Sequence, residues 1–467
     1  MSDGAAAMQA SLIDDSLNPA GDVALFTDAQ WLDALLRFEA GLARAQAASG
    51  LIPAAAAAAI ARACAAVQLD RTSFVERARH TGALGIGLVD PIKDRLSHQA
   101  PEALPYLHWG TTTQDAVDTA HALLTQTALA ALLRELDGLD AALRTMARAH
   151  AATPIMARSL LQPAQITSFG LKCAQSAAAL RRSTDQLRHL APRALCVQLG
   201  GAVGNRAAMG RQANEVEQAL AAELGLSACG HSWHTQRDAW MRLAMEVAVC
   251  TGSLAKLARD WSLMSQFEVA ELTEAPRGRT SSAMPHKRNP VHCMQAIAQT
   301  HPIPGLAATL LASMAQAHER ALGEWQAELS AWAPFWRHAH AAAAALRLAA
   351  EGLQVDTARM QANIDALQEV VYSEACAHAL APLAGREAAQ QAVERLAAQA
   401  LAQGLPLSHL LQRWMDDTHG AEYTPIAQQA LAVATDPRRA VQASADNCAV
   451  LLDGLDSATP EQEPEDV

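Results

Sequence analysis

The chain has 467 residues, of which 51% are hydrophobic and only 4% aromatic, and its formal net charge is −12. Alanine and leucine dominate while strand-favouring residues are scarce, so the composition predicts an all-α protein large enough for two or three domains. The acidic balance argues against nucleic-acid binding. No secretory signal, no charge-free membrane-spanning stretch and no CxxC motif among eight cysteines are found, so a cytoplasmic protein with free thiols is expected.

The N-terminal part of the chain is predicted to start with disorder over residues 1–20, which lack an apolar period. A helix is predicted to begin near Asp28, since four large apolar side chains recur there at helical spacing. They are Trp31, Leu35, Phe38 and Leu42. Pro53 precedes an alanine run, as at a helix start. Between 82 and 110 proline and glycine become frequent, so loops and short helices are expected.

Two later stretches follow a strict seven-residue repeat of apolar residues. The first comprises Leu129, Leu132, Leu136, Leu139, Leu143 and Met146. The second comprises Trp240, Leu243, Val247, Cys250, Leu254, Leu257, Trp261 and Met264. Such a seam is typical of long helices in a coiled-coil-like bundle, and we predict that the bundle continues across subunits. A long helix inside a monomer is the alternative.

These changes of pattern divide the chain into three predicted domains. A helical N-terminal domain covers 21–114, a central long-helix bundle covers 115–353, and a small helical C-terminal domain covers 354–458. The acidic tail, 459–467, is predicted to be disordered.

The segment 276–290, PRGRTSSAMPHKRNP, interrupts the helical pattern of the predicted central domain with three prolines, a glycine and two serines. It also gathers basic residues and a histidine in an acidic chain. They are Arg277, Arg279, His286, Lys287 and Arg288. Such a cluster suits a polyanionic substrate, and a solvated loop without function is the alternative.

Residues 281–290 resemble the GSSxMPxKxNP motif of the fumarase/aspartase superfamily, with Thr280 in place of the leading glycine. In that family the loop is mobile, closes over the substrate and brings in a catalytic serine. The resemblance implies Ser281 as the proton-transferring residue, and which of Ser281 and Ser282 reacts is left open. It also implies that cationic and amide groups of the loop hold a substrate carboxylate, which stabilises the charge of a carbanion formed beside it. These groups belong to Lys287, Arg288 and Asn289.

A second segment, 108–115 (HWGTTTQD), resembles the HxGxTSxD stretch of the same family and leads into a predicted helix. The resemblance assigns its polar side chains to substrate binding. They are His108, Thr112, Thr113 and Gln114. Hydroxyl and amide groups ahead of a helix N-terminus make an anion site, and plain helix capping is the alternative.

A third segment, 158–170, resembles the RTHxQxAxPTTFG stretch of the family and places Arg158 and Gln162 at the substrate. Leu160 stands where lyases of the superfamily carry a histidine acid. A departing amine needs such an acid, whereas a carboxylate with a pKa near 4 does not. In carrying an apolar residue at this position the chain resembles the branch of 3-carboxy-cis,cis-muconate cycloisomerases, in which a substrate carboxylate adds across its own double bond.

The resemblance implies lactonisation of a small tricarboxylate in aromatic-compound breakdown, with neither a metal nor an organic cofactor. It also implies a homotetramer in which each active site is built from three subunits. Two alternatives stay open. One is a β-elimination lyase such as adenylosuccinate lyase, with His80 or His108 as the acid, and the other is a non-catalytic structural member of the fold. Two histidine pairs lack a third metal ligand: His231 with His234, and His338 with His340.

Overall fold

The structure is a computed structural model in which the chain divides into two compact units. It describes residues 12–19, 23–82, 84–275, 284, 286–320 and 322–457. The first unit comprises Met1–Asp137, Arg182–Ala255 and Gln295–Ala345, and the second comprises Gly138–Arg181, Lys256–Met294 and Leu346–Val467. The three-domain boundaries drawn from the sequence stay a prediction.

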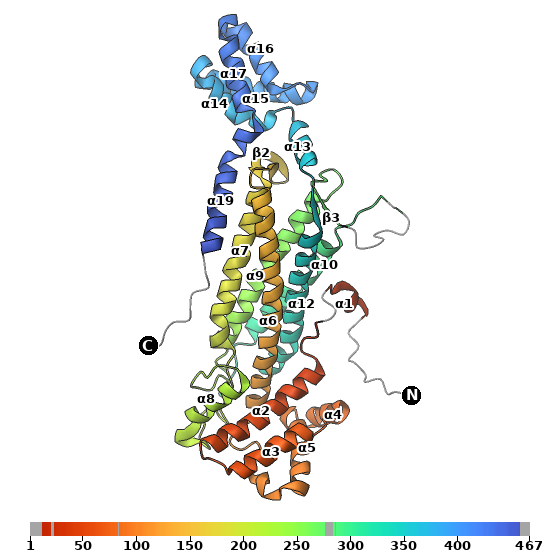
Figure 1. The fold of residues 1–467 in the computed structure, drawn as a ribbon, viewed down its shortest axis with the longest axis vertical. Helices are drawn as coiled ribbons and strands as arrows, with labels where there is room; N and C mark the ends of the chain where they lie inside the picture. Colours follow the sequence, from red (N-terminus) through yellow and green to blue (C-terminus); the bar gives the residue numbers. More distant parts are fainter. Residues whose placement is uncertain are drawn as a thin grey trace. The chain divides into compact units, whose positions relative to one another are not determined.

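Helices dominate the described chain, which confirms the all-α class (Figure 1). The first helices are α1 (Leu12–Leu17), α2 (Asp28–Ala48), α3 (Ala54–Ala66), α4 (Arg71–Thr81), α5 (Leu84–Gln99) and the 3-10 helix η1 (Pro101–Tyr106). Those of the middle are α6 (Thr113–Ala149), α7 (Phe169–Ala194), η2 (Gly210–Gln212), α8 (Ala213–Leu224), α9 (Asp238–Met264), α10 (Val291–Thr300), α11 (Ile303–Ala312) and α12 (Glu324–Gly352). The last are α13 (Thr357–Asp365), η3 (Val370–Tyr372), α14 (Ser373–Ala384), α15 (Arg386–Gln403), α16 (Leu407–His419), η4 (Ala421–Tyr423), α17 (Thr424–Ala434), α18 (Pro437–Ala440) and α19 (Gln442–Ser457).

Both apolar seven-residue repeats lie on long helices, α6 and α9, as predicted. Every repeat position is buried except Met146, which is half-buried. By length and composition α6 could also cross a membrane, but 78% of its most apolar window is buried inside the structure. That burial is the pattern of a core helix.

Helix α2 begins near Asp28, where the sequence predicts. The prediction of disorder over residues 1–20 is wrong for Leu12–Leu17, which form helix α1. The hydroxyl of Thr27 accepts a hydrogen bond from the backbone N–H of Gln30, whose side chain accepts one from the backbone N–H of Thr27. This capping box fixes the start of α2. In Figure 1, α2 lies beside α3 in the same unit.

Helix α5 is longer than the loops and short helices expected between 82 and 110, and it carries Pro91 in its interior. Its glycines allow close packing. A Cβ atom on Gly85 would lie 2.4 Å from the Thr113 hydroxyl oxygen, at the start of α6. Tertiary packing therefore outweighs the low helix propensity of glycine and proline here.

The described residues include four short strands that the composition does not predict. Strands β1 (Pro154–Ser159) and β2 (Gln162–Ser168) form an antiparallel hairpin, and β3 (Leu272–Glu274) pairs antiparallel with β4 (Leu353–Val355). Leu160 and Leu161 make the hairpin turn with φ angles of 51° and 63°. Two successive positive φ angles suit the twist of a two-residue hairpin, although β-turn statistics favour asparagine and glycine there.

The C-terminal helices of the second unit enclose a core of their own. Its buried residues come mainly from α14, α15 and α16, among them Cys376, Leu380, Val393, Leu407, Leu411 and Met415. Helices α14, α15, α16 and α17 lie together in Figure 1. The C-terminal segment is thus mainly helical.

An aromatic cage in the first unit surrounds His121 of α6, whose side chain is fully buried. The rings of Trp31, Trp240 and Trp332 lie 5.1 to 5.4 Å from the imidazole, and Phe26 lies 6.1 Å away. Neither ring nitrogen of His121 has a hydrogen-bond partner. Burial, with the Arg237 charge nearby, lowers the pKa of His121 well below its usual value.

Replacing His121 by Phe should make stability less sensitive to acid. The folded protein holds His121 neutral, while the unfolded chain protonates it below about pH 6.5. Stability linked to the neutral form is thus present above about pH 6.5 and is lost as the pH falls toward the folded-state pKa. Melting temperatures measured from pH 8 to pH 5 should therefore fall less steeply for His121→Phe than for the native protein. The phenylalanine variant also has no buried nitrogen that lacks a hydrogen-bond partner at this position.

The matched control is His378→Phe, because His378 is exposed on α14. It should reproduce the pH slope of the native protein. Parallel curves for His121→Phe and the native protein would contradict the assignment.

Candidate active site

Residues 108–112 form a tight turn that leads into α6, and Glu39 of α2 anchors it. The Glu39 carboxylate, which is buried, lies 2.6 Å from Nδ1 of His108. Burial alone would lower the pKa of His108, but the Glu39 carboxylate outweighs it and raises that pKa above its usual value. His108 and Gly110 both have positive φ angles, 55° and 75°. The turn therefore places a half-buried imidazole, whose charged form Glu39 favours, directly ahead of the helix.

Asp115 lies in the first turn of α6 and binds the backbone of neighbouring segments. Its buried carboxylate accepts four hydrogen bonds, two at each oxygen. The donors are Gly200 N at 2.8 Å, His234 Nε2 at 2.7 Å, Gly201 N at 2.9 Å and Thr112 N at 3.0 Å. One side chain thus joins the start of α6 to the turn after α7 and to the segment before α9.

The glycine turn fits closely against this centre. A Cβ atom on Gly200 would lie 2.4 Å from the Ser232 hydroxyl and 2.6 Å from Cε1 of His234. At Gly201 a side chain is disfavoured because the φ angle is 70°, a left-handed backbone conformation that glycine adopts readily. Nδ1 of His234 is buried without a hydrogen-bond partner.

Of the predicted binding residues in this segment, Gln114 points inward. Its amide nitrogen donates to the His234 carbonyl at 3.0 Å and to Asp118 at 3.3 Å, and its side chain is buried. Thr112 is half-buried, and its hydroxyl accepts a hydrogen bond from Arg320. The structure thus adds a cation at the predicted anion site.

A buried charge network lies just below these groups. The Arg237 guanidinium donates to Asp118 at 2.8 Å and to Glu328 at 3.1 Å, and all three side chains are fully buried. The indole nitrogens of Trp325 and Trp240 donate to the same two carboxylates, at 2.9 and 3.0 Å. Both carboxylates are therefore hydrogen-bonded, but a single guanidinium serves the two of them, and burial raises the pKa of Glu328.

The third predicted segment belongs to the second unit. Arg158 of β1 makes a two-pronged ion pair with the buried Glu271, at 2.9 and 3.2 Å, and Asn363 donates to the same carboxylate at 2.9 Å. Gln162, at the start of β2, is exposed. Leu160 beside it is 96% exposed, so within this chain it shields nothing from water.

The basic segment of the second unit is described only in part, and Ser281 and Ser282 lie outside the described residues. Lys287 and Arg288 are exposed, and Asn289 is half-buried. Glu274, the last residue of β3, accepts hydrogen bonds of 3.0 Å from the backbone N–H groups of His292 and Cys293. Its carboxylate thus caps the N-terminus of α10, where a negative charge interacts favourably with the positive end of the helix dipole. Glu274 therefore connects the residues just before the basic segment with those just after it.

Sequence patterns single out His108 and 112–114 in the first unit, and they miss four partners of that site. These are Glu39, Asp115, His234 and Arg320. Asp115 stands in the HxGxTSxD-like stretch, so the stretch itself carried the signal. The contacts with Glu39, His234 and Arg320 join distant segments, which no local pattern reveals.

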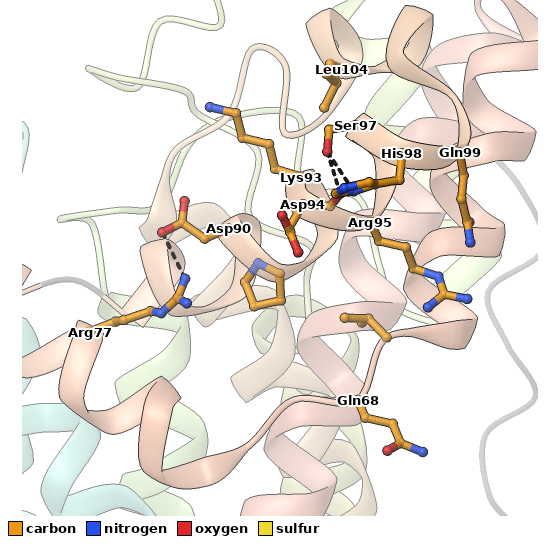
Figure 2. Close-up of a pocket in the computed structure, with 12 residues that line it drawn as sticks. Gln68, Arg77, Asp90, Lys93, Asp94, Arg95, Ser97, His98, Gln99 and Leu104 are labelled. Carbon is orange, nitrogen blue, oxygen red and sulfur yellow. Dashed lines mark hydrogen bonds and ion pairs between the residues drawn. The ribbon is translucent and has the colours of Figure 1, made fainter.

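An open cavity of about 930 Å³ lies elsewhere in the first unit, against α4 and α5 (Figure 2). Arg77 and Asp90, which form an ion pair of 3.1 Å, line it together with Lys93 and Asp94. None of the predicted site residues lines this cavity. Within the described ranges, no three His, Cys, Asp or Glu side chains are grouped to bind a metal ion.

Comparison with known proteins matches most of the chain. A family model described as lyase matches residues 22–304. The 3-carboxy-cis,cis-muconate cycloisomerase of Bradyrhizobium diazoefficiens is 40% identical over 402 residues, covering 86% of this chain and 89% of that protein. The enzyme of the same name from Pseudomonas aeruginosa is 42% identical over 393 residues, covering 83% and 85%. A crystal structure of the 3-carboxy-cis,cis-muconate lactonizing enzyme from Pseudomonas putida has a TM-score of 0.86 and 35% identity, covering 95% of this chain and 98% of that one.

Removing the His234 ring should loosen both segments that Asp115 holds. A hydrogen bond to a charged group contributes about 1.5–3 kcal/mol, or roughly 10- to 100-fold in a local opening equilibrium. In His234→Leu, peptides covering 110–115 and 198–202 should exchange amide hydrogens at least ~10-fold faster. In His234→Gln the rate should return toward the native value, because the glutamine Nε2 can donate from nearly the same place.

The matched control is His231→Leu, because His231 is exposed and its ring contacts only the Cys229 carbonyl among the interactions of the described residues. Native exchange rates in His234→Leu, or no recovery in His234→Gln, would show that Asp115 does not depend on this ring.

Proposed function

The chain belongs to the lyase family of the fumarase/aspartase superfamily, and from this premise we propose that it is a 3-carboxy-cis,cis-muconate cycloisomerase. The observation that carries the proposal is the agreement of curated relatives and a solved structure on this one activity, each over more than four-fifths of both chains. The chain is an enzyme, and its substrate is a small molecule.

In the proposed reaction one carboxylate of the substrate adds across a double bond of the same molecule. The new C–O bond closes the lactone and leaves negative charge on the carbon beside a second carboxylate. Delocalisation into that carboxylate puts the charge within reach of cationic and amide groups. We assign this stabilisation to Lys287 and Asn289, and protonation of the carbon to Ser281.

The charge pattern supports a polyanionic substrate. In a chain of net charge −12, the predicted segments place cations next to hydroxyl and amide groups. In the first unit, His108 has a raised pKa beside Glu39, and Arg320 contacts the Thr112 hydroxyl. In the second unit, Lys287 and Arg288 are exposed. Three substrate carboxylates need such complementary charge.

Position 160 supports lactonisation over β-elimination. Expulsion of an amine needs a proton donor at the leaving nitrogen, whereas a carboxylate leaves or adds without one. Leu160 supplies no proton, and His80 lies exposed on α4, as a surface histidine does. Of the two histidines considered as acids, only His108 lies among the predicted binding residues, and Glu39 favours its charged form there.

We further propose a homotetramer with shared active sites. Leu160 and Leu161 are 96% and 76% exposed at the tip of a hairpin, next to Gln162, and Phe267 in the same unit is 89% exposed. Val249, on the outer face of the long helix α9, is 61% exposed. Large apolar side chains at a hairpin tip and on a bundle helix fit burial against other subunits.

The proposed chemistry uses side chains alone, so we propose that the enzyme works without a metal or an organic cofactor. We also propose that it works in the cytoplasm. All eight cysteines are free thiols, and seven of them are buried. Such thiols suit a reducing compartment.

The activity and the serine assignment are tested together. The native protein should convert 3-carboxymuconate, followed as loss of the conjugated-diene absorbance. Ser281→Ala should lower kcat by about 10²–10⁴-fold, the usual effect of losing a proton-transfer group. The native fold should persist in the variant by circular dichroism.

The control is Ser282→Ala, which should keep most of the activity. Near-native kcat in Ser281→Ala would disprove the serine role alone. A higher kcat/KM of the native protein for adenylosuccinate than for 3-carboxymuconate would overturn the proposed activity.

Shared active sites predict complementation between inactive variants. Gln162→Ala and Ser281→Ala each disable a residue that different subunits bring to one site. Mixing them under subunit-exchange conditions should restore part of the activity, because some sites then hold both native residues. No recovery despite exchange verified by native mass spectrometry, or a monomer by light scattering at micromolar concentration, would contradict the shared site.

A further inference from the structure

Helix α2 carries two buried polar side chains that reach the turn ahead of α6. The Glu39 carboxylate lies 2.6 Å from Nδ1 of His108, and the Gln46 amide nitrogen donates to the Trp109 carbonyl at 2.8 Å. Glu39 is 1% exposed and Gln46 is fully buried. The two residues stand two helical turns apart, so they lie on the same face of α2. One helix face therefore holds both a side chain and a carbonyl of the turn.

The backbone of this turn is strained at His108. Its φ angle of 55° lies in the left-handed region, which side chains other than glycine rarely adopt, and Gly110 follows with 75°. A residue with a side chain persists in that region only when its surroundings hold it there. The contacts made by Glu39 and Gln46 hold the turn from α2, and the Glu39 contact fixes the direction of the imidazole ring.

The two ring nitrogens of His108 have different surroundings. Nδ1 faces the buried Glu39 carboxylate, whose second oxygen has no hydrogen-bond partner among the described residues. Nε2 makes no hydrogen bond within the described part of the chain, and the side chain is 18% exposed. Because Nδ1–H is bound to Glu39, a proton that the ring gains is carried at Nε2. The protonated ring therefore offers a free N–H donor on the side away from Glu39.

The acidic groups around His108 favour the protonated ring. Burial would lower the pKa of His108, but the charges of Glu39 on α2 and Asp115 on α6 raise it. Asp115 already accepts four hydrogen bonds, whereas Glu39 contacts the ring directly. From α3 the Cys64 thiol faces Glu39 and stays neutral, because burial and the Glu39 charge raise its pKa to about 12. Glu39 is thus the charge in closest contact with the ring.

We propose that Glu39 is a positioning residue, which holds His108 with Nε2 turned toward the substrate as a charged donor to one substrate carboxylate. The inference rests on the proposed function and deepens it, because it assigns one carboxylate of the substrate to this pair. Nε2–H of His108 donates to a carboxylate oxygen while Nδ1–H stays on Glu39, and no proton is transferred. The pair thus binds the substrate and the transition state alike, which affects KM rather than kcat.

The charge of His108 can be followed without turnover. Diethyl pyrocarbonate acylates only unprotonated imidazole, so the modification rate of the His108 peptide in the full-length protein, measured against pH, reports the neutral fraction of the ring. In Glu39→Gln, which keeps the shape but loses the charge, this rate at about pH 6 should be at least ~10-fold higher, with the midpoint at lower pH. In Glu39→Asp, which keeps the charge, the midpoint should stay closer to the native one. A merely structural role predicts the reverse order, because glutamine matches glutamate in shape.

Steady-state kinetics of the same variants separate binding from chemistry. With 3-carboxymuconate at neutral pH, Glu39→Gln should raise KM about 10-fold while kcat stays within about 3-fold, as expected when binding common to both states is lost. The matched control is Glu223→Gln, another acid-to-amide change, which removes the partner that Arg44 of α2 contacts at 2.5 Å. It should leave both KM and the His108 midpoint unchanged.

Equal His108 midpoints in the native protein and Glu39→Gln would overturn the inference, as would a fall in kcat without a rise in KM. Neither result affects the proposed function, which depends on turnover by the native protein. Absence of 3-carboxymuconate turnover by the native protein would instead overturn the proposed function, and with it the substrate role of the pair.

Discussion

The buried ion cluster of Arg237 with Asp118 and Glu328 is the interaction on which the first unit depends. Its members come from α6, from the residue just before α9 and from α12, so it fixes three bundle helices against one another. Removing three charges from water is costly, and the cluster persists because indole N–H groups and the guanidinium satisfy the carboxylates. Loss of one partner would strand a buried charge, at a typical cost of about 3–5 kcal/mol.

The predicted substrate-binding turn rests on that cluster through neighbouring side chains. Asp118 stands one helical turn after Gln114 and Asp115, and the Gln114 amide contacts it at 3.3 Å. Asp115 in turn accepts hydrogen bonds from three donors in two other segments and from Thr112 N of its own segment. The geometry at the start of α6 is thus set by buried polar groups rather than by the loop itself. This arrangement is how a site keeps rigid donors for a charged substrate.

Helix positions and the apolar seams of α6 and α9 could be predicted because 3.6-residue periodicity is a local property of sequence. The hairpin of β1 and β2 escaped prediction because Leu160 and Leu161 adopt left-handed backbone angles that their side chains do not favour. The sequence motifs identified candidate binding residues in both units. They did not identify partners such as His234, because its contact with Asp115 joins residues far apart in the chain. Ser281, the residue with the central predicted role, lies outside the described residues.

The cap that Glu274 places on α10 has an evolutionary consequence. One carboxylate thus holds the end of β3 beside the first turn of α10, so the two ends that the intervening residues must join are fixed. The entropic penalty of closing a loop between fixed ends grows only by about 0.6 kcal/mol for each doubling of its length. Insertions, deletions and whole replacements between Glu274 and α10 are therefore cheap for the framework. Changes of length there would leave the helices on either side in place, whereas the residues assigned to the reaction would have to be kept.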